Sequence, residues 1–170
     1  RASTILFNTM QELKAHEVKV KQHKSVSHYT YGRYGSTTTI ELENILKKLE
    51  KAYHVFLTGT GFGGIALALM SLCRPGDEIL VSDNVYGPTK EISEKLLKEF
   101  NINAQFYDPE SFEDLKNKVT KKTKMIVVEN PGSITFEFQD LSKIVNLAKK
   151  KKIYTLLDNT WGTPLYLQPL

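Results

Sequence analysis

The stretch Met125-Ile126-Val127-Val128-Glu129 is a short apolar run, and the turn residues Asn130-Pro131-Gly132 follow it directly. Short apolar runs bounded by Gly, Pro and Asn are typical of β-strands. Similar runs alternate along the chain with amphipathic stretches. The expected strands are His54–Thr58, Glu78–Ser82, Ala104–Tyr107, Met125–Glu129 and Tyr154–Asp158, and the expected helices between them are Phe62–Cys73, Thr89–Phe100, Ser111–Val119 and Gln139–Lys150. This alternation predicts an α/β domain with a mostly parallel sheet and helices on both faces.

The first part of the chain has a different pattern. A helix is expected from about Thr9 to Lys21, and Ser25 to Thr39 is rich in Ser, Thr, Tyr and Gly, which favours a loop or arm. Thr37 to Thr39 offer N-caps for a helix that continues to about Ala52. We therefore expect an N-terminal arm and helix over residues 1–52 and an α/β domain over 53–170.

Composition and charge narrow the class of protein. The 170 residues include 23 Lys+Arg and 19 Asp+Glu, a net charge of +4, with an ordinary globular share of apolar residues. The lysines are interleaved with acids and only three residues are arginine, so we expect no nucleic-acid interface. No apolar run is long enough for a membrane span, and a single cysteine favours a reducing, cytoplasmic setting.

No metal site is expected from the histidines. These are His16, His23, His28 and His54, and their spacing does not match that of metal ligands. The one cysteine, Cys73, follows an apolar helix face and is expected in the core.

A glycine-rich loop follows the first expected strand. Gly59, Gly61 and Gly64 satisfy the pattern G-x-G-x-x-G, and Asp83 lies further along the chain. This pattern is typical of dinucleotide binding, although glycines before a helix N-terminus suit any phosphate. A nicotinamide-dependent oxidoreductase is therefore one hypothesis, and a bare strand-to-helix turn is another.

Two other residues favour a different phosphate-bearing cofactor, pyridoxal phosphate. Its ring needs an aromatic side chain to stack on, which Tyr86 offers, and its pyridine nitrogen needs a carboxylate, which Asp158 offers at the end of a strand. A nicotinamide fold has no obvious use for either residue. Alone, Tyr86 could instead be a packed loop residue and Asp158 a helix cap.

Five motifs in one order make the sequence similar to the pyridoxal phosphate enzymes of Cys/Met metabolism. They are Tyr31-Gly32-Arg33, Thr60-Gly61-Phe62, Val85-Tyr86-Gly87-Pro88-Thr89, Glu129-Asn130-Pro131-Gly132-Ser133 and Asp158-Asn159-Thr160. Within the family, Pro131 to Glu137 and the arm motif most resemble the bacterial cystathionine β-lyases. Thr60-Gly61-Phe62 departs from the commoner Ser-Gly-Met, but Thr60 keeps the hydroxyl. The resemblance implies the arm plus most of a fold-type I, aminotransferase-like large domain, truncated.

The resemblance also implies roles for particular residues. Asp158 would pair with the pyridinium nitrogen, Tyr86 would stack on the ring, and Gly61 and Phe62 would hold the phosphate through their backbone N–H groups. Ser133 would lie near the cofactor hydroxyl. Tyr31 and Arg33 would reach the phosphate in a neighbouring subunit, so the implied assembly is a homodimer or homotetramer with shared sites.

The reaction implied is α,β-elimination, in which cystathionine gives homocysteine, pyruvate and ammonia during methionine biosynthesis. The family's Schiff-base lysine lies beyond the aspartate, and no lysine here matches it. The chain begins at Arg1 and ends at Leu170, so we expect a cut piece that does not turn over substrate alone. A catalytically dead fragment of a split gene is the remaining alternative.

Overall fold

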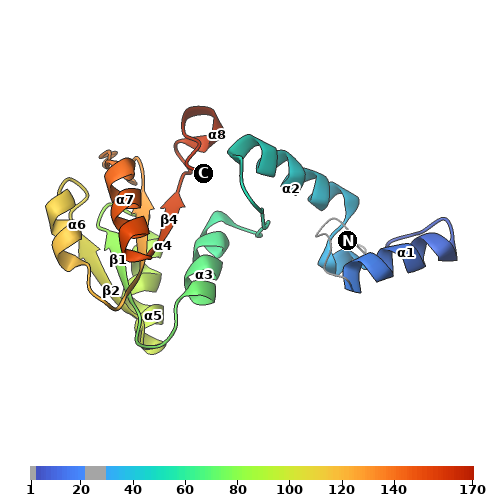
Figure 1. The fold of residues 1–170 in the computed structure, drawn as a ribbon, viewed down its shortest axis with the longest axis horizontal. Helices are drawn as coiled ribbons and strands as arrows, with labels where there is room; N and C mark the ends of the chain where they lie inside the picture. Colours follow the sequence, from blue (N-terminus) through green and yellow to red (C-terminus); the bar gives the residue numbers. More distant parts are fainter. Residues whose placement is uncertain (1–2, 22–29) are drawn as a thin grey trace. The chain divides into compact units, whose positions relative to one another are not determined.

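The chain forms two compact units, which are described separately (Figure 1). The computed structural model describes residues 3–21 and 30–170. The first unit contains the described residues up to 57 together with 168–170, and the second contains residues 58–167. His23, His28 and the first part of the expected loop, residues 25–29, lie outside the described residues.

The first unit contains helix α1 (Met10–Lys21), the 3-10 turn η1 (Gly32–Tyr34) and helix α2 (Thr37–Glu50). The predicted N-terminal helix is thereby confirmed. The predicted cap of α2 is wrong by one residue, because Ser36 is the N-cap. The backbone N–H of Thr39 donates to Ser36 Oγ, and Thr39 Oγ1 accepts from the N–H of Ser36. This reciprocal capping box makes Thr39 the third residue of the helix.

The second unit is built on a parallel sheet of four strands. They are β1 (Glu78–Ser82), β2 (Asn103–Tyr107), β3 (Thr123–Glu129) and β4 (Tyr154–Asp158). The spatial order is β2-β1-β3-β4, and every neighbouring pair is parallel. Four of the five expected strands are therefore confirmed, to within two residues at their starts.

The remaining expected strand, His54–Thr58, is wrong. This run pairs with no strand in the described part of the chain, and Phe56 within it is 74% exposed. An apolar run becomes a strand only where a neighbouring strand supplies hydrogen bonds, and the described sheet supplies none here.

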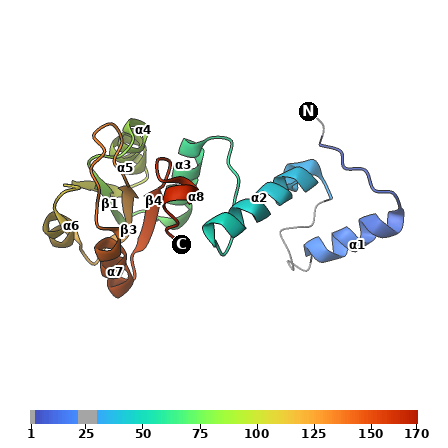
Figure 2. The same ribbon diagram turned by 90° about the horizontal axis from the view of Figure 1, so that it is seen from above.

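Helices cover both faces of the sheet, as expected (Figure 2). They are α3 (Gly61–Leu72), α4 (Gly87–Glu91), which continues through the π-helical segment η2 (Ile92–Leu96) into α5 (Leu97–Glu99), then α6 (Phe112–Lys118) and α7 (Leu141–Lys151). A last short helix, α8 (Thr163–Tyr166), follows β4 and has no buried residue. No helix of the described residues is long and apolar enough to cross a bilayer.

Successive strand residues point to opposite faces, and each face has its own core. On one face Ile79, Val81, Met125 and Val127 pack with Ile65 and Leu69 of α3, with Ile92 of η2, with Leu97 of α5 and with Cys73, the C-cap of α3. On the other face Leu80, Ile126 and Val128 pack with residues of α6 and α7, including Leu115, Ile144 and Ala148. The expected core position of Cys73 is confirmed.

The sheet order creates a switch point between β1 and β3. The connection after β1 turns to the face of α4, whereas the connection after β3 leads to α7 on the opposite face. Ligands of open α/β sheets bind where neighbouring connections diverge in this way, at the carboxyl ends of the strands. The fold therefore indicates a site beyond the ends of β1, β3 and β4.

Candidate active site

The N-terminus of α3 lies at the carboxyl edge of the sheet. Only a short segment, Cys73–Asp77, joins the end of α3 to the start of β1, so the helix runs antiparallel to the strands. Thr60 is its N-cap, and Thr60 Oγ1 accepts the N–H of Gly63 at 2.9 Å. Among the described residues, the N–H groups of Gly61 and Phe62 have no acceptor. These two donors are therefore available to an anion, which the helix dipole also favours.

Tyr86 lies at the head of α4, in the connection after β1. Its backbone N–H donates to Glu129 Oε2 at 2.6 Å, and its carbonyl accepts the N–H of Thr89 at 2.8 Å. The side chain is 47% exposed. Its ring is thus available for stacking, while its backbone is held on both sides.

Asp158 ends β4, directly beside Glu129 in the register of β3 and β4. Its Oδ1 accepts the backbone N–H of Thr160 at 3.0 Å and the Thr160 hydroxyl. These bonds form a local turn and cap no helix, because α8 begins at Thr163 and its N-cap is Gly162. No hydrogen bond within the described residues uses Oδ2 of Asp158, so that oxygen remains available to a cation.

Ser133 belongs to the loop after β3, which crosses toward the loop after β1. Its N–H donates to the carbonyl of Asn84 at 2.8 Å. Asn84 Nδ2 in turn donates to Glu137 Oε2, whose hydrogen bonds with Thr135 and Asn84 lower the pKa of Glu137. Gly132 packs so tightly here that a Cβ would lie 2.0 Å from Asn84 Nδ2. The two loops are therefore locked together across the switch point.

Gln139 fastens the ends of three strands beneath this site. Its Nε2 donates to Ser82 Oγ at 3.0 Å and to the carbonyl of Glu129, and its Oε1 accepts the hydroxyl of Tyr107 at 2.8 Å. Both Gln139 and Tyr107 are buried, and burial raises the pKa of Tyr107. Satisfied buried networks of this kind fix one arrangement of the groups that they connect.

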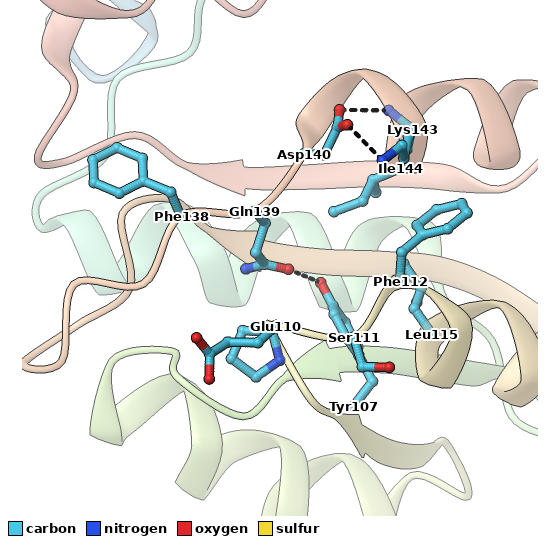
Figure 3. A pocket seen from close by; sticks show the side chains of 11 residues that line it. Tyr107, Glu110, Ser111, Phe112, Leu115, Phe138, Gln139, Asp140, Lys143 and Ile144 are labelled. Carbon is cyan, nitrogen blue, oxygen red and sulfur yellow. Dashed lines mark hydrogen bonds and ion pairs between the residues drawn. The ribbon is translucent and has the colours of Figure 1, made fainter.

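A hollow of about 220 Å³ lies beside this network, between α6 and α7 (Figure 3). Phe112, Leu115 and Ile144 form its apolar side, and Gln139 with the hydroxyl of Tyr107 forms its polar side. None of the residues implied by the resemblance lines this hollow. The hollow is therefore distinct from the candidate site.

Tyr31 and Arg33 belong to the first unit, on either side of Gly32 in and before η1. The guanidinium of Arg33 lies 5.3 Å from the ring centroids of both Tyr31 and Tyr34, a cation–π arrangement. Arg33 is exposed and pairs with no carboxylate of the described residues. Its charge is therefore available to an anion.

Pyridoxal phosphate fits the groups found in the second unit. Unused N–H donors at α3 suit its phosphate, and a Cβ added at Gly61 would meet nothing within 4 Å, so space before the helix is open. The exposed ring of Tyr86 and the open oxygen of Asp158 suit its ring and its pyridine nitrogen. Donors, aromatic and carboxylate all come from the carboxyl edge of one sheet.

Comparison with known proteins gives the same assignment. The family model described as Cys/Met metabolism PLP-dependent enzyme matches residues 1–170. The chain belongs to this family. The Cys/Met metabolism enzymes depend on pyridoxal phosphate, and the chain has the family's α/β fold with a parallel sheet.

Individual relatives agree with the family. Cystathionine beta-lyase of Bordetella avium is 34% identical over 170 residues, which cover 100% of this chain and 42% of that protein. A Campylobacter jejuni structure containing N'-pyridoxyl-lysine-5'-monophosphate matches with a TM-score of 0.84 and 27% identity over 98% of this chain and 40% of that one. Cystathionine gamma-lyase of Lactobacillus plantarum, complexed with L-serine, matches with a TM-score of 0.83 and 26% identity over 99% and 40%. The chain spans about two-fifths of the length of these relatives.

The nicotinamide hypothesis is wrong. A dinucleotide fingerprint needs a strand directly before its glycines, and the run before Gly59 is not a strand. Asp83, the acidic residue that follows the glycines in this pattern, forms an ion pair with Lys90 at 2.5 Å. The glycines belong instead to the head of α3 in a Cys/Met metabolism enzyme.

Sequence reasoning gave no role to Glu129, which the structure places at the centre of the candidate site. It is 3% exposed, and burial followed by the nearby charge of Asp158 raises its pKa. The sequence did contain a signal for this residue, because Glu129 is a charged residue at the end of an otherwise apolar run. Trp161, which follows Thr160, is half exposed, and its ring makes an edge contact with that of Phe136, with the centroids 4.9 Å apart.

Proposed function

We propose that the protein containing this chain is a pyridoxal phosphate-dependent carbon–sulfur β-lyase acting on cystathionine. Water is consumed, the Cβ–S bond of cystathionine breaks, and the products are homocysteine, pyruvate and ammonia. The observation that carries the proposal is the meeting of three groups at one sheet edge: the N–H donors of α3, the ring of Tyr86 and the carboxylate of Asp158. The β-lyase name of the Bordetella avium relative supports this choice of substrate.

Each residue would have a separate task. When bound, pyridoxal phosphate supplies an electron sink for the negative charge that develops at the substrate Cα. Gly61 and Phe62 would hold the phosphate by N–H donation, with the positive end of the α3 dipole behind them. Asp158 would keep a proton on the pyridine nitrogen through Oδ2, because its Oδ1 is already bonded to Thr160.

Tyr86 and Ser133 would orient the cofactor ring. The phenol ring of Tyr86 would stack on one face, a contact that also excludes water from that face. Ser133, fastened through its N–H to the carbonyl of Asn84, would lie near the ring hydroxyl. Tyr31 and Arg33 would bind the phosphate in a neighbouring copy, so that a complete site requires at least a homodimer.

The products distinguish this reaction from its nearest alternative. The protein containing this chain is incubated with pyridoxal phosphate and cystathionine, and pyruvate and 2-oxobutyrate are measured separately. We expect pyruvate and homocysteine in equal amounts; 2-oxobutyrate with cysteine would instead establish γ-elimination. Asp158→Asn should lose most of the activity, whereas Glu113→Gln, which changes an exposed residue of α6 that forms an ion pair with Lys116, should retain it.

A further inference from the structure

Glu129 is a buried carboxylate to which the proposed chemistry assigns no task. Burying a carboxylate is costly unless hydrogen bonds compensate for the lost water. The carboxylate oxygen Oε2 of Glu129 accepts the backbone N–H of Tyr86 at 2.6 Å. This donor belongs to the segment after β1, which carries a candidate cofactor ligand, whereas Glu129 itself ends β3.

The bond from Tyr86 determines where its ring can lie. Tyr86 precedes the first turn of α4, and its carbonyl accepts the N–H groups of Thr89 and Lys90. Glu129 holds the opposite side of the same residue, through the N–H that the helix does not use. With both backbone groups bonded, side-chain rotation is the main remaining freedom of Tyr86.

We propose that Glu129 is a positioning residue for the cofactor: its carboxylate holds the backbone of Tyr86 across the switch point, so that the phenol ring is already placed for stacking before pyridoxal phosphate binds. This inference rests on the proposed function. In this role Glu129 acts through Tyr86 and needs no contact of its own with the cofactor or the substrate. Preorganising a ligand-binding side chain improves affinity because binding no longer has to order it.

Three substitutions separate the hydrogen bond from the charge and the length of the side chain. Glu129→Gln keeps an oxygen that can accept the Tyr86 N–H. Glu129→Asp keeps the charge, but its side chain is one methylene shorter. Glu129→Met removes the acceptor. In the protein containing this chain, freed of cofactor, the dissociation constant of pyridoxal phosphate is measured by absorbance and fluorescence titration. Thermal unfolding of each cofactor-free variant checks that it folds.

We expect Glu129→Gln to bind nearly as tightly as the wild type, and Glu129→Asp and Glu129→Met to bind roughly tenfold or more weakly, the effect of leaving the Tyr86 N–H without its acceptor. The visible circular dichroism of the bound cofactor, which reports the orientation of its ring, should change in the Asp and Met variants but not in Gln. If Glu129→Met fails to fold, the comparison of Gln with Asp decides.

A second background tests whether Glu129 acts through Tyr86. In Tyr86→Ala, the further change Glu129→Asp should alter the dissociation constant little, because the ring that it positions is gone. An equal weakening in both backgrounds, or unchanged affinity in folded Glu129→Asp and Glu129→Met, would overturn the inference. Glu113→Gln is the matched control. Absence of pyridoxal phosphate binding in the wild type would instead overturn the proposed function.

Discussion

Glu129 and Asp158 are register partners at the carboxyl ends of two adjacent parallel strands, so two carboxylates with different surroundings lie side by side. Glu129 is buried, whereas Asp158 is half-buried and is bonded to Thr160. Burial, and after it the charge of Asp158, raise the pKa of Glu129, so the fold favours the protonated form of Glu129.

This pair predicts a pH dependence of stability. Because the pKa of Glu129 is raised above the ordinary value of 4.5, the folded state binds this proton more tightly than the unfolded state. The resulting stabilisation is complete below pH 4.5 and is lost as the pH rises through the folded pKa. Glu129→Gln cannot titrate, so its free energy of unfolding, relative to that of the wild type, should rise over this window.

The measurement is urea unfolding of both proteins at a series of pH values from acid to neutral. A difference in unfolding free energy that stays constant with pH reflects a small packing change in Glu129→Gln. The test is whether that difference changes with pH. Parallel curves across the whole range would contradict the raised pKa of Glu129.

Gly132→Ala should destabilise the loops on either side of the switch point. The added Cβ would lie 2.0 Å from Asn84 Nδ2, and Asn84 is buried and bonded to Ser82. We expect a loss of about 1–3 kcal/mol in the free energy of unfolding, as for other overpacked sites. Gly59→Ala is the control, because a Cβ there meets nothing within 4 Å. Equal stability of the two variants would show that Asn84 can move aside.

Two leucines of α3 provide a matched test of the core. Leu69 is fully buried against the sheet, whereas Leu67 on the same helix is 52% exposed. Leu69→Ala should cost about 2–5 kcal/mol in chemical unfolding. Leu67→Ala should stay within about 0.5 kcal/mol of the wild type. A larger loss for Leu67→Ala than for Leu69→Ala would contradict the orientation of α3.

Shared sites predict complementation between two inactive variants. Arg33→Ala removes the exposed cation beside Tyr31, and Asp158→Asn removes the carboxylate at the end of β4. If Arg33 serves the site of a neighbouring copy, mixed oligomers contain one site with both residues intact. Unfolding and refolding the two variants together should then restore part of the β-lyase activity. Refolding each alone provides the control, and no recovery in the mixture would contradict a shared site.

Local patterns predicted most of the fold, and long-range contacts explain the rest. The runs that became β1 to β4 were recognisable because each carries its apolar residues within a few positions. His54–Thr58 has similar composition, but whether a run becomes a strand depends on a partner that composition does not specify. Glu129 could be seen to close a strand, yet its bond to Tyr86 joins residues 43 positions apart.

For the candidate site, the resemblance supplied the residues and the structure supplied their geometry. Gly61, Phe62, Tyr86, Ser133 and Asp158 all belong to the second unit and to connections at its carboxyl edge. The network of Asn84, Glu137 and Gln139 was not predicted, because amides and carboxylates in loops are ordinarily solvated. Only the fold shows that they join three strand ends.

β4 is an edge strand of the described sheet, and its free edge lies beside the candidate site. Within the described residues, β4 is hydrogen-bonded to β3 on one side only, which leaves a row of backbone donors and acceptors along its other side. A further strand added there in parallel would finish level with Asp158. The last residue of such a strand would then lie next to Asp158. The free edge of β4 can therefore add a side chain to the candidate site while the residues already there keep their places.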